Sequence, residues 1–278
     1  MKKASQRGAF FVSAAARSAA WLLVALLSGL GWTTGAQGAA CPTPRIDQWV
    51  VVSRVIDGDT LRLSDGRKLR LIGINTPELG RDGRPAEPLA QTARRALVDL
   101  LGDAPRLGLR FGREREDRYK RLLAHAYLPD GRNVEVSLLE QGLAAYIVVP
   151  PNTALSGCYR QAERLARDAG RGVWDSVYRP LPVDRVARDR GGFRIITGTV
   201  VRVGESRRSL WLNFQRSPGE GPREGVAVRI SREDLGHFRQ WDPRRLQGRR
   251  VTVRGWWRPY KKQLVTRLRH PAALEILR

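Results

Sequence analysis

The chain has 278 residues, more than one small barrel needs, and this length suits two compact domains. Hydrophobic residues make up 42% of the chain, so it can bury sizeable cores, which excludes wholesale disorder. The 50 Lys and Arg residues outnumber the 27 Asp and Glu residues, which gives a net charge of +23. This charge favours polyanionic partners such as nucleic acids or anionic membranes, although an arginine-rich composition alone also explains it.

The N-terminal segment has the features of a secretion signal. Positive charges precede an apolar run from Ala19 to Trp32, and small residues follow up to Ala40. The run is shorter than the about 20 apolar residues of a transmembrane helix. We therefore predict a signal peptide over residues 1–40, a periplasmic or secreted mature protein and no membrane span within it. An uncleaved N-terminal membrane anchor is the alternative.

Two cysteines, Cys41 and Cys158, follow this leader. In an oxidising compartment they are a natural pair for a disulfide. Such a bond closes a long loop and would add about 4–5 kcal/mol by restricting the unfolded chain. Two unpaired buried thiols are the alternative.

The charge is unevenly distributed along the chain. Residues 41–178 contain 22 basic and 18 acidic residues, whereas residues 179–278 contain 24 basic and 9 acidic residues. At the start of the second part, residues 179–192 combine Pro, Gly and charged residues without an apolar period, which predicts a linker. We therefore predict a first domain over residues 41–178, this linker, and a basic second domain over residues 193–278.

The first domain is predicted to have an α+β fold, mainly β, around a small closed sheet. Three strands come first, joined by tight turns at Asp57-Gly58-Asp59 and Ser64-Asp65-Gly66. Helical spacing of apolar residues then alternates with further short strands. The predicted strands are 49–56, 60–63, 68–74, 107–111 and 122–128, and the predicted helices are 88–101, 135–141 and 155–169.

Three segments carry residues suited to phosphodiester chemistry. Asp57 and Asp59 flank a glycine turn, and Arg70 leads into a loop that ends at Glu78. Carboxylate, amide and carbonyl oxygens are ligands of hard cations such as Ca²⁺, and guanidinium groups, here including Arg121, hold phosphates. Each motif alone more often forms a turn, a cap or a solvated face. Their order and spacing give them weight.

The segments 56–60, 70–78 and 117–121 closely resemble, in order and spacing, the three signatures of the staphylococcal nuclease (thermonuclease) family. Further similarities follow at 139–144, 151–153 and 172–174, so the resemblance covers roughly residues 50–175. It implies an OB-type five-stranded barrel with packed helices. It also implies a Ca²⁺-dependent endonuclease that cuts DNA and RNA with little sequence preference.

The resemblance implies a role for each matching residue. Asp59 would bind Ca²⁺ through its carboxylate and Thr76 through its backbone carbonyl. Glu78 would act as general base or orient the attacking water. Arg70 and Arg121 would hold the phosphate and stabilise the charge of the transition state.

Other positions in the motifs have supporting or altered roles. Asp57 would be a carboxylate beside the metal ligands, and Tyr119 and Tyr146 would line the nucleotide pocket. Asn75 stands where the family archetype has Asp. Its amide oxygen can still coordinate Ca²⁺, but the loss of one formal charge predicts weaker binding. A catalytically silent nucleic-acid-binding scaffold is the alternative function, and retention of the charged residues favours an active enzyme.

The second domain is predicted to be a smaller OB-like barrel. Its predicted strands are 195–203, 209–214, 226–230, 250–256 and 263–268, with a helix after the third, which is the OB order. Aromatic and basic residues cluster near the connection between the fourth and fifth strands, a composition typical of single-strand binders. Because adjacent residues of a strand point to opposite faces, one of the two tryptophans belongs to the core. The predicted nucleic-acid-binding cluster is Arg254, Trp256, Trp257, Arg258, Tyr260, Lys261 and Lys262.

DNA, RNA or both are therefore the predicted partners, and no obligate protein partner is evident in the sequence. Binding of the basic domain to anionic envelope polymers or to a partner protein is the competing interpretation.

Overall fold

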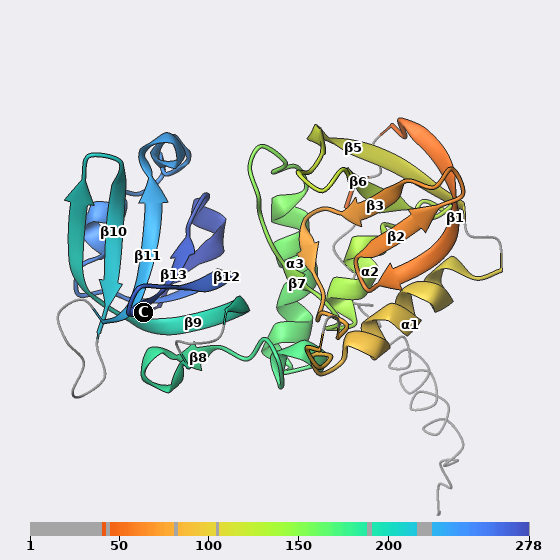
Figure 1. The fold of residues 1–278 in the computed structure, drawn as a ribbon. Coiled ribbons are helices and arrows are strands. Elements are labelled where there is room, and N and C mark those ends of the chain that lie inside the picture. The colour runs from red at the N-terminus through yellow and green to blue at the C-terminus, as the bar shows by residue number, and fades with distance from the viewer. Residues whose placement is uncertain are drawn as a thin grey trace, which may run out of the picture. The chain divides into compact units, whose positions relative to one another are not determined.

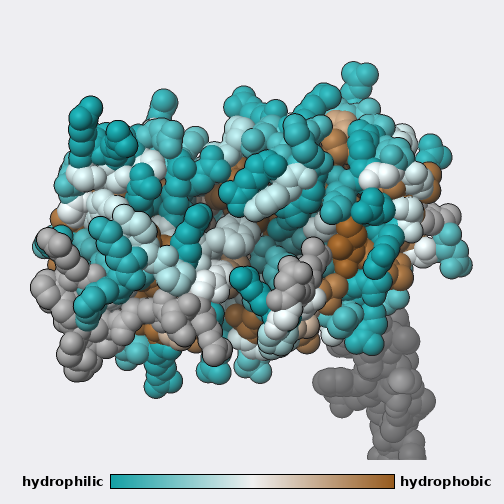
Figure 2. All heavy atoms as spheres, viewed as in Figure 1, coloured by the Kyte–Doolittle hydropathy of each residue, from teal (hydrophilic) through white to brown (hydrophobic). Residues whose placement is uncertain are grey.

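The computed structural model describes residues 41–42, 45–80, 83–103, 106–187, 191–215 and 224–277 (Figure 1). The predicted signal peptide, residues 1–40, lies outside the described residues. Within the described ranges, no helix has the length and apolar character needed to cross a bilayer. Hydrophilic side chains cover most of the face shown in Figure 2, with small hydrophobic patches between them.

The first barrel is closed by five strands in the order β1-β2-β3-β6-β5. Its strands alternate buried and exposed residues, as in β2 and β3, where Leu61, Leu63, Leu69 and Leu71 point into the core. All neighbouring strands are antiparallel except β3 and β6, which run parallel. The strands are β1 (Gln48–Asp57), β2 (Thr60–Leu63), β3 (Lys68–Leu71), β5 (Arg106–Glu116) and β6 (Leu122–Tyr127).

Three helices and a two-stranded sheet pack on this barrel. In α1 (Ala90–Leu101), Ala93, Leu97 and Leu101 recur every four residues and bury one face of the helix. The other elements are α2 (Val134–Glu140), α3 (Ser156–Asp168), the 3₁₀ helix η1 (Gly172–Trp174) and the paired strands β4 (Ile74–Asn75) and β7 (Ala145–Tyr146). This arrangement confirms the predicted α+β barrel.

The second barrel repeats the strand order of the first. The ring β9-β10-β11-β13-β12 closes because β9 pairs with both β10 and β12, and its third and fifth strands, β11 and β13, again run parallel. The predicted OB-like barrel is thus confirmed. Two 3₁₀ helices, η3 (Arg232–His237) and η4 (Pro243–Leu246), follow its third strand, where one helix was expected. The strands are β9 (Gly192–Ser206), β10 (Ser209–Phe214), β11 (Gly225–Ser231), β12 (Arg250–Tyr260) and β13 (Gln263–Arg267), with β14 (Leu274–Ile276) added beside β12.

Part of the segment 179–192, for which the composition predicts a linker, is packed on the second barrel. Within it, β8 (Leu181–Pro182) pairs in parallel with β9, and η2 (Val183–Arg185) follows. Val183 and Val186 are buried in the core of the second barrel. Two isolated valines are too few to produce an apolar period, so the sequence alone does not reveal that the segment is packed.

Buried contacts join the two barrels, and Ala39–Arg278 form one compact unit. On α3, both oxygens of Glu163 accept hydrogen bonds from Arg254 of β12, at 2.8 Å each. The two domains also share an apolar cluster, in which Phe193 and Ile195 of β9 pack against residues from the first domain. Those partners are Ala145, Ile147, Ala166, Val173, Trp174 and Tyr178.

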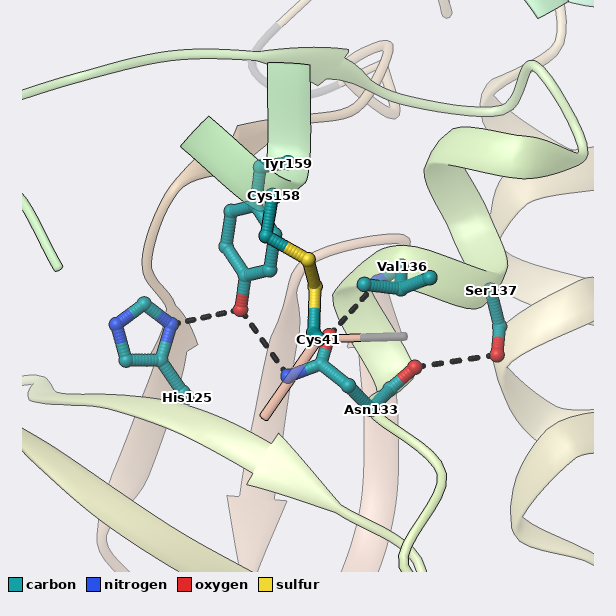
Figure 3. The surroundings of a disulfide bond; sticks show 7 residues. All are labelled: Cys41, His125, Asn133, Val136, Ser137, Cys158 and Tyr159. Carbon is teal, nitrogen blue, oxygen red and sulfur yellow. Dashed lines mark hydrogen bonds between the residues drawn. A yellow bond between two sulfur atoms is a disulfide. The ribbon is translucent and has the colours of Figure 1, made fainter. Parts of the chain in front are cut away.

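A disulfide joins Cys41, ahead of β1, to Cys158 in α3 (Figure 3), so these cysteines are not the unpaired thiols of the alternative interpretation. Beside it lies a buried polar network. The hydroxyl of Tyr159 accepts a hydrogen bond from Nδ2 of Asn133 at 3.2 Å and lies 2.7 Å from Nδ1 of His125. Burial lowers the pKa of His125 to about 4, so the ring is neutral and its Nδ1 can accept a hydrogen bond from the hydroxyl of Tyr159.

The fully buried Glu135 of α2 should make the folded state less stable at alkaline pH. Burial raises its pKa from 4.5 to about 8, although the backbone amide of Ala126 donates to its carboxyl group. Between these values the unfolded state binds fewer protons at this group, so the free energy of unfolding falls as pH rises. Because the pKa of His125 is lowered from 6.5 to about 4, this residue makes the free energy of unfolding rise with pH between those values, and its effect ends near pH 6.5. From pH 6.5 to 8, we expect Glu135 to lower stability by up to about 1.4 kcal/mol per pH unit.

Urea denaturation at pH 6.5, 7.25 and 8 would measure this contribution. The range begins at the ordinary pKa of histidine, 6.5, and ends at the raised pKa of Glu135, about 8. The Glu135→Gln variant should show a flatter pH dependence than the wild type. Glu233→Gln, at an exposed position, should keep the wild-type slope. Equal slopes for wild type and Glu135→Gln would contradict the prediction.

Candidate active site

The three segments singled out in the sequence meet in one pocket of about 1020 Å³. Strand pairing contributes to this, because β3, which carries Arg70, lies between β2, which follows the turn at 57–59, and β6, which follows the segment 117–121. The predicted site residues that line the pocket are Asp57, Asp59, Arg70, Asn75, Glu78, Tyr119 and Arg121, and Trp256 and Arg258 of the second barrel line it as well.

The turn between β1 and β2 places two carboxylates side by side. Asp57 and Asp59 are 6% and 4% exposed, and the amide of Asp59 donates to Oδ1 of Asp57 at 3.2 Å. A Cβ on Gly58 would lie 2.8 Å from both Cβ of Ala93 and Oγ1 of Thr76. Only glycine therefore lets the turn pack this closely against α1 and the loop after β4.

Arg70 is the cation that faces these carboxylates. Its Nη1 lies 2.5 Å from Oδ2 of Asp59 and donates to the carbonyl of Leu71 at 3.1 Å. Its Nη2 donates to the carbonyl of Ile74 at 3.1 Å and to Oδ1 of Asn75 at 3.3 Å. These bonds fix the plane of a guanidinium group that is only 12% exposed. Among the described residues, none accepts a hydrogen bond from its Nε.

The donor set fits a hard divalent cation. Burial, and next the neighbouring Asp59 carboxylate, raise the pKa of Asp57 to about 7, while Arg70 acts in the opposite direction. Two buried carboxylates and the guanidinium of Arg70 thus share the site, and carboxylate oxygens are ligands that hard divalent cations accept. The described residues contain no cluster of three or more Asp, Glu, His or Cys side chains, so amide and carbonyl oxygens and water would complete the coordination.

Asn75 and Thr76 are both buried beside Asp59. The amide of Thr76 donates to Oδ2 of Asp59 at 3.0 Å, and Nδ2 of Asn75 donates to the carbonyl of Thr76 at 3.2 Å. The same Nδ2 donates to the hydroxyl of Tyr178 at 2.8 Å. Asn75 therefore uses its two N–H groups to hold the loop, an arrangement that an aspartate could not make.

Arg121 and Tyr119 also line the pocket, and Asp117 orders both of them. Oδ1 of Asp117 accepts from the amides of Tyr119 and Arg121, at 2.8 Å and 3.0 Å. Its Oδ2 accepts from Nε of Arg121 at 2.7 Å. The guanidinium carbon of Arg121 lies 5.5 Å from the ring centroid of Tyr119, which is 63% exposed. The pocket lining thus includes the aromatic ring of Tyr119 and the guanidinium group of Arg121, which Asp117 holds in place.

Glu78 is exposed at the mouth of the pocket. Its amide donates to Oε2 of Glu87 at 2.9 Å, and its carbonyl accepts from the amide of Glu87 at 2.9 Å. These two contacts hold the backbone of Glu78, which lines the pocket.

Three of the predicted nucleotide- or nucleic-acid-binding residues are outside the pocket lining and are held by other parts of the protein. Tyr146 is only 2% exposed, because it sits in β7 opposite Ile74 and turns its ring into the core. Trp257 is 1% exposed in the core of the second barrel. Arg254 is engaged by Glu163 and by the carbonyl of Tyr146 at 2.8 Å. The interpretation of these three as nucleic-acid contacts is therefore wrong.

The remaining members of the basic cluster divide into two groups. Trp256 is 42% exposed and, with Arg258, lines the pocket. Tyr260, Lys261 and Lys262 are exposed but lie outside the pocket lining. Lys262 pairs with Glu224 at 2.9 Å, and Nζ of Lys261 lies 5.7 Å from the ring centroid of Tyr260. These three stay predictions for nucleic-acid binding away from the pocket.

Sequence reasoning missed four residues that contribute to the site. Asp117 is part of the third motif and could have been found there. Tyr178 follows the last recognisable motif, and Arg269 lies in the second domain, so no spacing links either to the pocket. Asn152, in the similarity at 151–153, ties the loop before α3 to Glu114 through bonds of 2.9 and 3.0 Å.

Comparisons with known proteins agree with this geometry. The sequence model of the family described as staphylococcal nuclease homologue matches residues 68–176. Thermonuclease from Staphylococcus intermedius is 34% identical over 128 residues, which cover 45% of this chain and 75% of that protein. Endonuclease YncB from Bacillus subtilis (strain 168) is 34% identical over 131 residues, 45% of this chain and 61% of that protein. Probable endonuclease LCL3 from Coccidioides posadasii (strain C735) is 32% identical over 119 residues, 39% of this chain and 37% of that protein. The chain thus spans less than two thirds of the latter two proteins.

Proposed function

Because this chain belongs to the staphylococcal nuclease homologue family, we propose that it is an exported, Ca²⁺-dependent endonuclease that hydrolyses DNA and RNA with little sequence specificity. One observation carries the proposal. Segments that lie up to about 60 residues apart in the sequence bring Asp59, Arg70, Glu78 and Arg121 to one pocket. Carboxylates and guanidinium groups in one pocket are the groups that phosphodiester hydrolysis requires.

Each residue has a role that follows from its surroundings. Arg70 and Arg121, fixed by bonds to other groups, hold the phosphate and stabilise the charge that grows on it in the transition state. Glu78 accepts a proton from the attacking water or orients it. Asp59, Asn75 and Thr76 would hold Ca²⁺, with Asp57 beside them. Bound Ca²⁺ supplies positive charge that polarises the phosphate and the attacking water.

The pocket lining supports low sequence specificity. Its charged groups suit phosphate oxygens, which all nucleotides share, and contacts of this kind position a nucleic acid without reading its bases. The excess of basic residues in the second domain supports binding that weakens as salt rises.

Export is supported by two features of the chain. The disulfide between Cys41 and Cys158 is of a kind that persists in oxidising compartments. The leader-like composition of residues 1–40 agrees with passage into such a compartment. We place the mature enzyme in the periplasm or outside the cell, and a membrane-anchored N-terminus is the alternative.

Digestion of single- and double-stranded DNA and RNA, with Ca²⁺ or with chelator, tests the proposal. We expect wild-type cleavage that needs the cation and falls about 10²–10⁴-fold in Glu78→Gln, because a general base contributes that much. Glu140→Gln, at a position in α2 outside the pocket, is the control and should cleave normally. Nucleic-acid binding without cation-dependent cleavage would instead identify a silent scaffold.

Asn75→Asp should strengthen Ca²⁺ binding and weaken the metal-free fold. A further carboxylate close to the cation adds several kcal/mol of attraction at an effective dielectric of about 20, so we expect at least about tenfold tighter binding. Without cation, loss of the bonds to Thr76 and Tyr178 should cost about 1–3 kcal/mol of stability. Thermal unfolding during a Ca²⁺ titration measures both effects. The control is Asn213→Asp, at a position outside the pocket lining, which should change neither the Ca²⁺ affinity nor the stability of the metal-free protein. Equal Ca²⁺ affinities of Asn75→Asp and wild type would refute the prediction.

A further inference from the structure

The wall of the catalytic pocket is completed by the second barrel. Along β12, residues 251, 253 and 257 are buried in the second core, so the even-numbered residues between and after them face outward. Of these outward residues, Trp256 and Arg258 line the pocket that holds the catalytic groups, together with Arg269 from beyond β13. The second barrel is therefore part of the cleft itself, which the sequence did not predict.

A second hollow, of about 320 Å³, shares part of its lining with this pocket. Both hollows are lined by Ile147 and Val149 of the first domain and by Trp256 of the second. Three guanidinium groups, those of Arg118, Arg258 and Arg269, also line both. The two hollows thus share an aromatic ring and several cations, a composition that suits the bases and phosphates of one strand.

Trp256 is fixed in place although its side chain is 42% exposed. Its ring packs edge-on against Phe193, with centroids 5.2 Å apart, and Phe193 packs in the same way on Tyr178, at 5.0 Å. The hydroxyl of Tyr178 in turn accepts the hydrogen bond from Asn75. A continuous set of contacts thus positions the exposed indole relative to the proposed metal ligands.

We propose that Trp256, with Arg258, forms a base-stacking subsite for the unpaired nucleotide next to the scissile phosphate, so that the enzyme prefers single-stranded nucleic acid. This inference rests on the proposed function. A base can lie on the indole only when it has left its own stack, and unstacking a duplex costs free energy that a single strand does not. Arg258 then contacts the phosphate that follows this base.

Substitutions at Trp256 test the subsite. Stacking of one base changes affinity by roughly tenfold to a hundredfold. We therefore expect Trp256→Leu, which keeps an apolar side chain against Phe193, to raise KM for a single-stranded oligonucleotide by that factor while kcat stays nearly constant. Trp256→Phe should retain most of the affinity. Duplex cleavage should change little, so the preference for single strands should largely disappear in Trp256→Leu.

Trp49 provides a matched control, because it is 43% exposed on β1, lies 5.1 Å from the guanidinium carbon of Arg106 and is outside the pocket lining. Trp49→Leu should leave KM for both substrates unchanged. An oligonucleotide with one abasic position beside the cleaved bond should reduce the difference between wild type and Trp256→Leu. Equal KM values for wild type and Trp256→Leu, or equal losses on single strand and duplex, would overturn the subsite.

Fluorescence anisotropy with a labelled single strand, measured on the same variants in chelator, separates this proposal from the proposed function. If the wild type cleaves nothing yet binds the strand more tightly than Trp256→Leu does, the subsite stands and the nuclease proposal fails. If the wild type cleaves but the two proteins bind equally, the nuclease proposal stands and the subsite fails.

Discussion

Replacing Arg70 by lysine should lower kcat/KM for phosphodiester cleavage by at least about a hundredfold, as the loss of one charge-stabilising donor commonly does. The guanidinium makes contacts with Asp59, Leu71, Ile74 and Asn75 at once, which a planar group with five N–H donors can do and an ammonium group cannot. Lysine would keep the charge but lose the fixed orientation. A phosphate would then meet a mobile point charge instead of a preorganised donor.

The control for this variant is Arg132→Lys. Like Arg70, Arg132 pairs with an aspartate, in this case Asp130 at 2.7 Å. Both side chains of this pair are more than half exposed, and neither lines the pocket. Its substitution should leave cleavage unchanged. Initial rates on a single-stranded substrate across a range of concentrations give kcat and KM for both variants. If Arg70→Lys cleaved as fast as Arg132→Lys, the phosphate-binding role of Arg70 would be wrong.

Breaking the buried pair between Glu163 and Arg254 should reduce the free energy of unfolding by about 3–5 kcal/mol. The two side chains are 3% and 11% exposed and share bonds of 2.8 Å. Burial lowers the pKa of Arg254, but the Glu163 carboxylate outweighs that effect and raises it above its usual range. In Arg254→Ala, the buried Glu163 carboxylate would keep, among the described residues, the hydrogen bond from the amide of Tyr146 at 2.9 Å. An unpaired buried charge of this kind is strongly destabilising.

A second ion pair joins the same two parts of the chain and serves as the control. Arg167 of α3 pairs with Glu275 of β14 at 2.8 Å, but the side chains are 35% and 48% exposed. Arg167→Ala should therefore cost at most about 1 kcal/mol. Urea denaturation of both variants compares the two pairs, and equal losses would contradict the prediction. The combined variant Glu163→Leu/Arg254→Met should cost less than the sum of the single substitutions, because neither charge is then left alone.

The buried pair also explains why deletion of the second domain is a poor test of its role. Ending the chain after residue 179 would uncover Glu163 and the apolar residues that Phe193 and Ile195 cover. The first domain would lose stability together with any nucleic-acid contacts. Point substitutions at Trp256 keep this interface intact and report on binding alone.

Much of the fold could be predicted because local signals agreed with one another. Alternating apolar residues predicted which faces of strands such as β2 and β10 are buried. Turn residues such as Gly58, between β1 and β2, predicted where one strand ends and the next begins. The motifs around Asp59, Arg70 and Arg121 also predicted which residues share a pocket, because their spacing follows from the strand order of the barrel. The sequence left the cysteine pairing open, and the structure closes that question with a disulfide.

Residue type and spacing, read along the chain, determined the two barrels, the helices of the first domain and the central members of the catalytic pocket, which are Asp59, Arg70, Glu78 and Arg121. Only the tertiary structure decided that Trp257 is core and Trp256 is exposed, that Tyr146 points inward, and that Arg254 joins the barrels instead of contacting nucleic acid. The physical reason is that periodicity says which side of a strand is buried but not what covers it. Here the outward face of β12 meets α3 and the catalytic pocket of a domain about 100 residues earlier in the chain, and a contact between such distant segments leaves no local pattern.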